Sequence, residues 1–416
     1  MSNIKYGAYL ILPLKYEEED LNIQKLEELC PRIAVDTMDL NENVKVMFNG
    51  SGDMQIGSVH MLSAEELSRR LGSNNCRVSS EGTSSSFSFM TSYIYLFHTR
   101  VAFLCLGVAL ESMDTLQAIC NPGFTEKTSE YCWIGTDGQE YGFSLEGWLE
   151  EFLALYGLKK FFDGPSSILL EYYSYTLALA DKRFQSLEEL RRKTFNLHQM
   201  VSVDAENEDD SEEDIRYVYA VKNQAEKSYR WGICVSSQTI NYIVADPEMN
   251  LEAEMAVQAR DGMPLVLLAL YEKYTCLRFT ELIADSGEKK AIRLSKLKEL
   301  MLKFHAFGTV KPANVSRWNN VRQIFAYLQE ICGIENAVED ISSKLSILSE
   351  QQQEIERKRN ETIMNLITVF GIVSILASVL SIIQILYDGN PALWIGTILT
   401  TGLLAVVFGV ALRVRK

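Results

Sequence analysis

The residues best placed to do chemistry lie in an uncharged, largely apolar stretch at positions 363–386. Its polar and small members are Asn365, Thr368, Gly371, Ser374, Ser378, Ser381 and Gln384. A polar group that faces lipid loses its hydrogen bonds to water and gains none in return, so these residues are expected to face protein or water. The 3-4-3 spacing from Gly371 to Ser381 gathers small residues on one face of a helix.

Two interpretations of that face stay open. Small residues allow close packing of neighbouring membrane helices. Alternatively, the hydroxyls line a water-filled pore, with Asn365, near its cytoplasmic mouth, and Thr368, Gly371, Ser374, Ser378 and Ser381 as the lining. A single helical hairpin cannot enclose water, so a pore requires a homo-oligomer whose first span is innermost.

A short polar turn follows at positions 387–391, with the sequence YDGNP. Gly389 can take a positive φ there, and Pro391 can open a following helix. If the chain forms a pore, Tyr387, Asp388, Gly389 and Asn390 form its entrance. The carboxylate of Asp388 would attract cations, and the amide of Asn390 would replace water in a cation's outer shell.

No set of residues points to catalysis or to a bound metal. The 8 cysteines occur singly, without C-x-x-C spacing, and the 4 histidines are dispersed. The cysteines are expected to be reduced, packed thiols in a reducing compartment. The chain also lacks a phosphate-binding loop, a nucleophile elbow and the H-E-x-x-H motif. We therefore do not expect an enzyme.

The length of two uncharged stretches predicts a membrane hairpin. Residues 363–386 and 392–412 are each uncharged throughout. At about 1.5 Å per helical residue, each stretch is long enough to cross a hydrocarbon core of roughly 30 Å. Basic residues flank the pair on one side: Arg357, Lys358, Arg359, Arg413, Arg415 and Lys416. The positive-inside rule then predicts a multi-pass protein of the cell inner (plasma) membrane, with both termini and the basic tail at 413–416 in the cytoplasm. A plain hairpin anchor satisfies the same pattern.

The preceding residues, 1–310, predict a cytoplasmic α/β sandwich domain, so the fold class is α+β. Strands are expected at 6–14, 86–98, 101–110, 217–222, 230–235 and 239–244, and helices at 63–71, 143–158 and 264–282. The net charge of −15 disfavours nucleic-acid partners. The acidic run at 204–214 predicts an exposed loop, or else a surface that concentrates cations at a cytoplasmic vestibule.

A long, coiled-coil-like stalk helix is expected at positions 316–362, continuing into the first span. Its apolar residues follow alternating steps of four and three: Ile334, Val338, Ile341, Leu345, Leu348 and, after an interruption at Gln352, Ile355. Such a seam needs a partner, either another copy of the chain or helices of its own domain. A continuous helix would couple the cytoplasmic domain rigidly to the membrane.

This layout, with a stalk helix, two C-terminal spans and a tight turn containing Asn, resembles the CorA family of divalent-cation channels. The resemblance covers about the last 100 residues by sequence and the rest by arrangement. Tyr387 and Asn390 match the family's Tyr-Gly-Met-Asn turn, and the basic ending LRVRK is similar. Asp388 and Gly389 replace the Gly-Met pair, and the first span lacks the proline that family members often carry.

The resemblance implies a pentameric funnel whose first span lines the pore, with Mg²⁺ as a permeant or regulatory ion. Divergent CorA-like proteins occur beside type III CRISPR systems. For these the resemblance implies a membrane effector of antiviral defence that opens when a nucleotide second messenger binds the cytoplasmic domain. The alternatives are an ordinary divalent-cation transporter and a membrane-anchored binding or scaffold protein with a hairpin that does not conduct.

Overall fold

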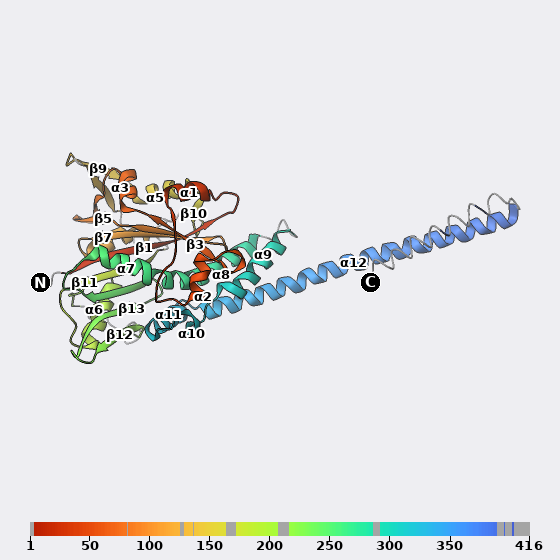
Figure 1. Ribbon diagram of the computed structural model, residues 1–416. Helices are drawn as coiled ribbons and strands as arrows, with labels where there is room; N and C mark the ends of the chain where they lie inside the picture. Colours follow the sequence, from red (N-terminus) through yellow and green to blue (C-terminus); the bar gives the residue numbers. More distant parts are fainter. Residues whose placement is uncertain are drawn as a thin grey trace. The chain divides into compact units, whose positions relative to one another are not determined.

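The computed structural model describes residues 4–80, 82–124, 129–135, 137–163, 172–206, 216–285 and 292–388, together with residues 395 and 402 (Figure 1). The chain divides into two units, Met1–Ile341 and Ser342–Lys416. We call Met1–Ile341 the folded unit. It extends beyond position 310, the boundary expected for the cytoplasmic domain.

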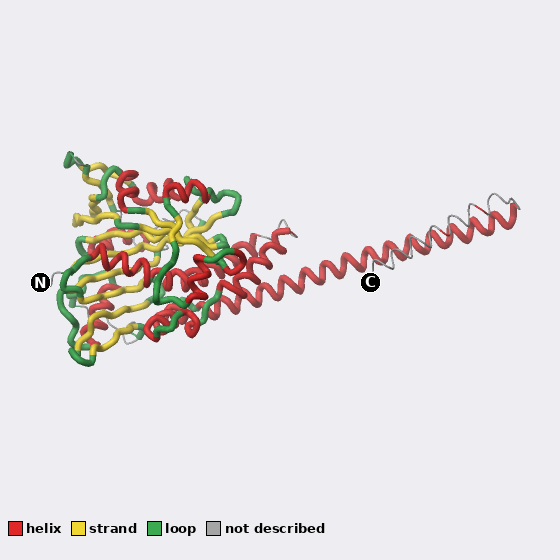
Figure 2. The backbone as a smooth tube through the Cα atoms, in the orientation of Figure 1, coloured by secondary structure: helices red, strands yellow, loops and turns green. Residues whose placement is uncertain are grey.

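The strands of the described residues form one hydrogen-bonded sheet, drawn in yellow in Figure 2. They are β1 (Lys5–Tyr16), β2 (Arg32–Ile33), β3 (Gly57–Leu62), β4 (Asn75–Ser80), β5 (Thr83–Phe89), β6 (Ser92–Phe97), β7 (Val101–Leu110), β8 (Glu130–Ile134), β9 (Glu140–Phe143), β10 (Leu158–Lys160), β11 (Tyr173–Ala180), β12 (Val218–Asn223), β13 (Ser228–Val235) and β14 (Thr239–Ala245). The main order is β12-β13-β14-β11-β1-β7-β5-β4-β8-β9, with β10 beside β1 and with β6, β3 and β2 branching from β7. The pair β11 and β14 is parallel, and the other pairs are antiparallel.

The two central strands confirm the expectation for residues 6–14 and 101–110. Both are rich in aromatic and β-branched or leucine side chains, and β1 is buried from Tyr6 to Tyr16. They pair along their length, from Tyr6 opposite Leu110 to Lys15 opposite Val101. The hairpin expected across residues 98–100 is confirmed between β6 and β7, where Phe97 lies opposite Val101.

The single strand expected at residues 86–98 is wrong, because it is two strands separated by a bulge. Phe89 of β5 lies opposite Val108, while Tyr93 of β6 lies opposite Cys105. Three residues, 90–92, therefore face only two residues of β7, and the extra residue bends the strand. A Cβ at Gly107 would lie 2.7 Å from the carbonyl oxygen of Thr91. Such a close approach of two backbones requires glycine.

The helices of the folded unit lie on both faces of the sheet. They are α1 (Ile23–Leu29), α2 (Glu42–Asn49), α3 (Ala64–Leu71), α4 (Met113–Phe124), α5 (Leu145–Ala154), α6 (Leu187–His198), α7 (Leu251–Asp261), α8 (Met263–Asp285), α9 (Ile292–Lys303), α10 (Pro312–Val315) and α11 (Asn319–Ile331), with a 3₁₀ turn at Gly52–Met54 and a π turn at Phe304–Gly308. The start expected at Ser63 is confirmed, because its hydroxyl accepts a hydrogen bond from the backbone N–H of Glu66. The buried helix expected at 264–282 is confirmed as α8.

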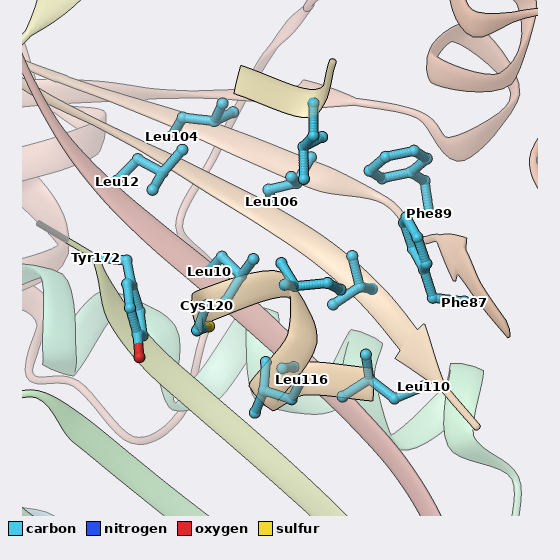
Figure 3. Close-up of a cluster of buried hydrophobic side chains, with 14 of the residues drawn as sticks. Leu10, Leu12, Phe87, Phe89, Leu104, Leu106, Leu110, Leu116, Cys120 and Tyr172 are labelled. Carbon is cyan, nitrogen blue, oxygen red and sulfur yellow. The ribbon is translucent and has the colours of Figure 1, made fainter. Parts of the chain in front are cut away.

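The core consists of two apolar layers separated by the sheet. Leu10 and Leu104 face one way and belong to a cluster with Leu116 of α4 (Figure 3). The same cluster includes Phe152 of α5. The alternate residues face the other way: the hydroxyl of Tyr9 donates to the Met255 carbonyl of α7 (3.2 Å). The period of two along each strand thus produces helix, sheet and helix layers. The expected mixture of helices and strands in one domain is confirmed.

The stalk helix expected at 316–362 is wrong in one respect, because a break at Gly333 divides it. Helix α11 ends at Ile331, and α12 runs from Ile334 to Asp388. Gly333 has a φ of 63°. This left-handed conformation ends a helix at little cost only for a residue without a Cβ. The expected continuation of the helix into residues 363–386 is confirmed, since α12 is one helix through residues 334–388.

The predicted apolar seam divides between two environments. Ile334 and Ile341 are buried, with exposed fractions of 3% and 1%, whereas Ile355 is 66% exposed. The first part of the seam therefore packs within the chain's own folded unit. At that end of the helix the partner is the chain's own domain, which is one of the two alternatives that the sequence left open.

Candidate functional site

One helix among the described residues is long and apolar enough to cross a membrane, and that helix is α12. Its most apolar window has a mean hydropathy of 2.6, with no part buried inside the chain. Bulky side chains such as Phe370 (69% exposed) and Ile375 (65%) lack cover from the described residues. We call residues 363–386 the apolar segment. A surface of this kind is unstable in water and requires lipid or other protein around it.

The predicted pore-lining residues lie on that segment, and α12 brings most of them to one side. At about 100° per helical residue, Thr368 to Ser381 fall within an arc of about 140°, while Asn365 lies further around the helix. The hydroxyl of Thr368 donates to the Met364 carbonyl (2.8 Å). It is thus already satisfied within the helix. Gly371, Ser374 and Ser378 are half-buried, in contrast to the exposed residues between them.

The predicted entrance is described only in part. Tyr387 and Asp388 form the last turn of α12, and Tyr387 is 93% exposed. Gly389 and Asn390 lie outside the described residues, as does the second expected span at 392–412 apart from residues 395 and 402. The two-helix hairpin, the exoplasmic turn and the basic tail therefore stay predictions.

The turns of α12 before the apolar segment are polar and carry paired charges. Lys358 donates to Glu354 (2.7 Å) and Arg357 to Glu361 (3.1 Å). Each pair is four residues apart, so its members are neighbours on the helix surface. The hydrogen bond from Lys358 lowers the pKa of Glu354, and both groups are fully exposed. These pairs support an isolated helix in water between residue 350 and the apolar segment.

The folded unit contains a groove of about 610 Å³ beside the β12–β14 end of the sheet. Its floor is the sheet face that carries Trp231 and Tyr242, and its walls come from α7, α11 and the loop at Asp39. Two rings of the floor, Trp231 and Tyr242, lie beside each other with a centroid separation of 5.8 Å. Tyr219 lies on the other side of Trp231, at 5.9 Å, outside the lining. Half-buried aromatic rings that face a groove can stack against a flat ligand.

Carboxylates line the α7 side of this groove. Asp261 accepts two hydrogen bonds from Arg260 (2.7 and 2.9 Å) and one from Thr37 (2.7 Å). Glu254 accepts one from the amide of Gln258 (2.8 Å). Burial raises the pKa of Asp39, and the negative charge of Asp261 raises it further.

Two basic side chains also line the groove, and both come from the sheet. Lys222 belongs to β12 and Arg230 to β13. The carboxylates of the groove thus lie on α7 and the Asp39 loop, and its basic side chains lie on the strands of the sheet. A ligand that is charged at one end would meet different partners in its two possible orientations.

The cysteines, the histidines and the acidic run at 204–214 do not form a binding site among the described residues. No group of three or more His, Cys, Asp or Glu side chains in the described part of the chain is arranged to hold a metal ion. The eight cysteines are free thiols, and six of them are buried. Of the acidic run at 204–214, Asp204 pairs with Lys193 (2.7 Å) and residues 207–214 lie outside the described ranges.

Comparisons with known proteins identify no relative. No family model matches the chain, and neither the curated proteins nor the solved structures contain a significant match. The resemblance to the CorA family therefore stays a prediction that rests on the layout and on the turn.

Sequence reasoning did not find the groove, because its residues come from distant segments. Asp39, Trp231 and Glu254 belong to a loop, a strand and a helix that only the fold brings together. One signal was available: alternation along β14 places Ile240, Tyr242 and Val244 on the same face. That pattern predicts a face but not what covers it.

Proposed function

We propose that this chain is a membrane protein whose copies assemble around an ion-conducting pore, with the apolar segment of α12 innermost. The single observation that supports it is the exposed apolar surface at residues 363–386, on a helix that begins inside the folded unit at Ile334. That surface has no cover within the described residues, so lipid and neighbouring copies are the natural cover.

The polar content of the segment supports a pore in preference to a simple anchor. An anchor gains nothing from Ser374, Ser378 and Ser381, whereas an axis that holds water or ions can use hydroxyls facing it. Under this proposal the folded unit and both termini lie in the cytoplasm, and residues 392–412 form a second span. Asp388 and Asn390 then stand at the exoplasmic entrance.

The folded unit is proposed to control the pore through a bound ligand, as a nucleotide second messenger would in antiviral defence. Helix α11 meets α12 at Gly333, and residues on both sides of this joint are buried, including Leu328 and Ile334. A ligand that moves α11 would therefore act on the first turn of the helix that carries the apolar segment.

A second candidate function is a membrane-tethered binding protein whose apolar helix only anchors. One observation favours it: Gly371, Ser374 and Ser378 are the least exposed of the described side chains in the segment. A face of small residues lets a neighbouring helix approach closely, which suits helix packing. This candidate predicts that the serine hydroxyls are dispensable.

Ion flux from liposomes that contain the purified full-length chain separates the two candidates. The test variant is the double substitution Ser374→Ala with Ser378→Ala, and its control is Ser343→Ala with Ser346→Ala on an exposed, polar part of the same helix. A hydrogen bond is worth about 1 kcal/mol, so flux is expected to change by about fivefold for each hydroxyl lost. The control pair is expected to conduct like the unmodified chain.

The oligomeric state has to be measured on the same samples by native mass spectrometry. A monomer in the bilayer, or an intact oligomer that conducts no ion under any ligand, would rule out the pore. Equal flux in the test and control variants would show that the hydroxyls do not line the ion path.

A further inference from the structure

We propose that the groove between the β12–β14 face, α7 and α11 binds a small organic cation that carries a flat ring. The groove measures about 610 Å³. This volume lies within the range of about 300–1,000 Å³ typical of sites for small molecules. Its lining combines an apolar, aromatic floor with charged and amide side chains from the strands, α7, α11 and the Asp39 loop.

The floor defines the shape of the ligand. The Trp231 and Tyr242 rings are inclined by only 33° to each other, and Trp231 and Tyr219 by 32°. Neighbouring strands hold these rings, because Trp231 lies opposite Val244 and Ile233 opposite Tyr242 in the β13–β14 register. Trp231 and Tyr242 both line the groove, so a flat group can pack against these two half-buried rings, which have little side-chain entropy left to lose.

The carboxylates define the charge of the ligand. Asp261 is already neutralised by Arg260, and the hydroxyl of Thr37 links it to the Asp39 loop by donating to Asp261 and accepting from the Asp39 backbone N–H (3.1 Å). Asp39 and Glu254 have no hydrogen-bonded basic partner of this kind among the described contacts, and both line the groove. A cationic group in the groove would be attracted by both carboxylates.

The aromatic floor strengthens this preference for a cation. An ammonium or similar group within about 6 Å of a Trp or Tyr ring is attracted by the ring's electron-rich face. Lys222 and Arg230 belong to β12 and β13, so the end of the ligand that lies beside them is neutral or anionic. The groove therefore orients a ligand with its cationic end toward the carboxylates of α7 and the Asp39 loop.

The groove lies where a bound ligand could regulate the pore, and this part of the inference rests on the proposed function. Asn320, Val321 and Ile324 of α11 form one wall, and α11 leads through Gly333 to α12. A ligand that joins α7 to α11 would restrain α11 and hence the first turn of α12.

Isothermal calorimetry on the full-length chain in detergent tests the binding itself, with tryptamine and indole-3-propionate as probes. Both carry the same ring, and only tryptamine is a cation. We expect tryptamine to bind and indole-3-propionate to bind at least tenfold more weakly. Comparable affinity for the two probes, or no binding of tryptamine to the folded chain, would overturn the proposal.

Two variants locate the site. Asp39→Asn removes the charge that faces the groove and is expected to weaken tryptamine binding about tenfold. Asp36→Asn, on the same loop at an exposed position outside the lining, is the matched control and is expected to bind like the unmodified chain. Circular dichroism has to show both variants folded. Equal affinity in the two variants would place the cation elsewhere and reject this site.

Trp231→Leu tests the floor separately, since leucine keeps an apolar contact but removes the ring. We expect tryptamine affinity to fall by at least fivefold, and an unchanged affinity would reject stacking. These measurements do not depend on conductance. If the chain binds tryptamine but conducts no ions, the proposed binding site is retained and the proposed pore is rejected. If it conducts ions but does not bind tryptamine, the pore is retained and the binding site is rejected.

Discussion

Helix α8 and the apolar segment of α12 are close in length and rich in apolar side chains, yet their surroundings differ completely. Residues 265–271 of α8 are each at most 5% exposed, whereas Leu376 and Leu380 of α12 are 57% and 65% exposed. The difference lies in the charges. Helix α8 contains ionic residues at several positions, and the apolar segment contains none.

Two ionisable side chains of α8, Arg278 and Glu272, are buried, and the fold supplies hydrogen-bond partners for both. Arg278, 3% exposed, donates to Glu17 (2.5 Å) and to Glu281 (2.6 Å). Glu272, 1% exposed, accepts from the backbone N–H of Val310 (2.8 Å) and from Gln329 (3.0 Å). A lipid environment offers no such partners, so ionic residues with polar neighbours mark an apolar helix that belongs inside a protein.

The largest expected effect comes from making the same substitution in both helices. Leu267 is completely buried. Leu267→Ala should therefore lower the free energy of unfolding of the folded unit by about 3 to 4 kcal/mol. Leu376→Ala should leave it unchanged, because that side chain is largely exposed. Denaturant unfolding followed by circular dichroism measures both. Equal losses in the two variants would contradict the distinction.

Insertion into the membrane is expected to depend on the apolar segment of α12, in contrast to the stability of the folded unit. Ile375→Arg places a charge in the middle of the apolar segment and should cost about 3 kcal/mol of insertion free energy. Ile355→Arg, on the polar part of α12, is the control and should insert normally. Resistance of the protein to alkaline extraction from membranes reports insertion. If both variants are extracted equally, the segment is not the membrane anchor.

The buried carboxylate of α8 should make the stability of the folded unit depend on pH. Burial raises the pKa of Glu272 to about 8, against 4.5 ordinarily. The group therefore binds more protons when folded, so its contribution is fully present below the unfolded pKa and is lost as pH rises through the folded pKa. The unfolding free energy should fall by about 3 kcal/mol from about pH 5 to pH 8.

Glu272→Gln serves as the comparison for that measurement, since the amide cannot ionise. Thermal unfolding of this variant should vary much less over the same pH range than that of the unmodified chain. Identical pH dependence in the two proteins would assign the effect to other groups.

The smallest effect is expected at the joint between the two regions. Gly333→Ala forces a left-handed conformation on a residue with a Cβ and should destabilise the folded unit by about 1 kcal/mol. Gly333→Asn should be milder, because Asn tolerates this conformation better. A Cβ at this position would meet nothing within 4 Å, so crowding does not complicate the measurement. If Gly333→Ala unfolds at the same temperature as the unmodified chain, α11 and α12 can merge into one helix.

Local patterns predicted several elements correctly because their causes are local. The start of α3 depends on the hydrogen bond between Ser63 and the backbone N–H of Glu66, three residues further on. Strand β7 is a run of ten residues, nearly all buried, which is typical of a strand inside a sheet. The bulge before Ser92 and the break at Gly333 were missed. The bulge depends on tertiary packing, through the approach of Gly107 to Thr91. The break falls at a glycine with a φ of 63°, and the sequence marks only the glycine, not the conformation that it adopts.

The candidate sites divide in the same way. The apolar segment and its serine face could be located from sequence, since length, absence of charge and helical spacing are properties of consecutive residues. The groove could not, because Asp39, Trp231 and Glu254 are far apart along the chain and become neighbours only through the order of strands and the packing of α7 and α11.

By itself, the sequence determined that residues 363–386 need an apolar environment, because the free energy of transferring uncharged side chains from water depends on composition alone. Only the tertiary structure decided that α8 finds its apolar environment inside the folded unit, and that Trp231 and Tyr242 share a groove with carboxylates. Those outcomes depend on contacts between distant residues, and such contacts exist only once the chain has folded.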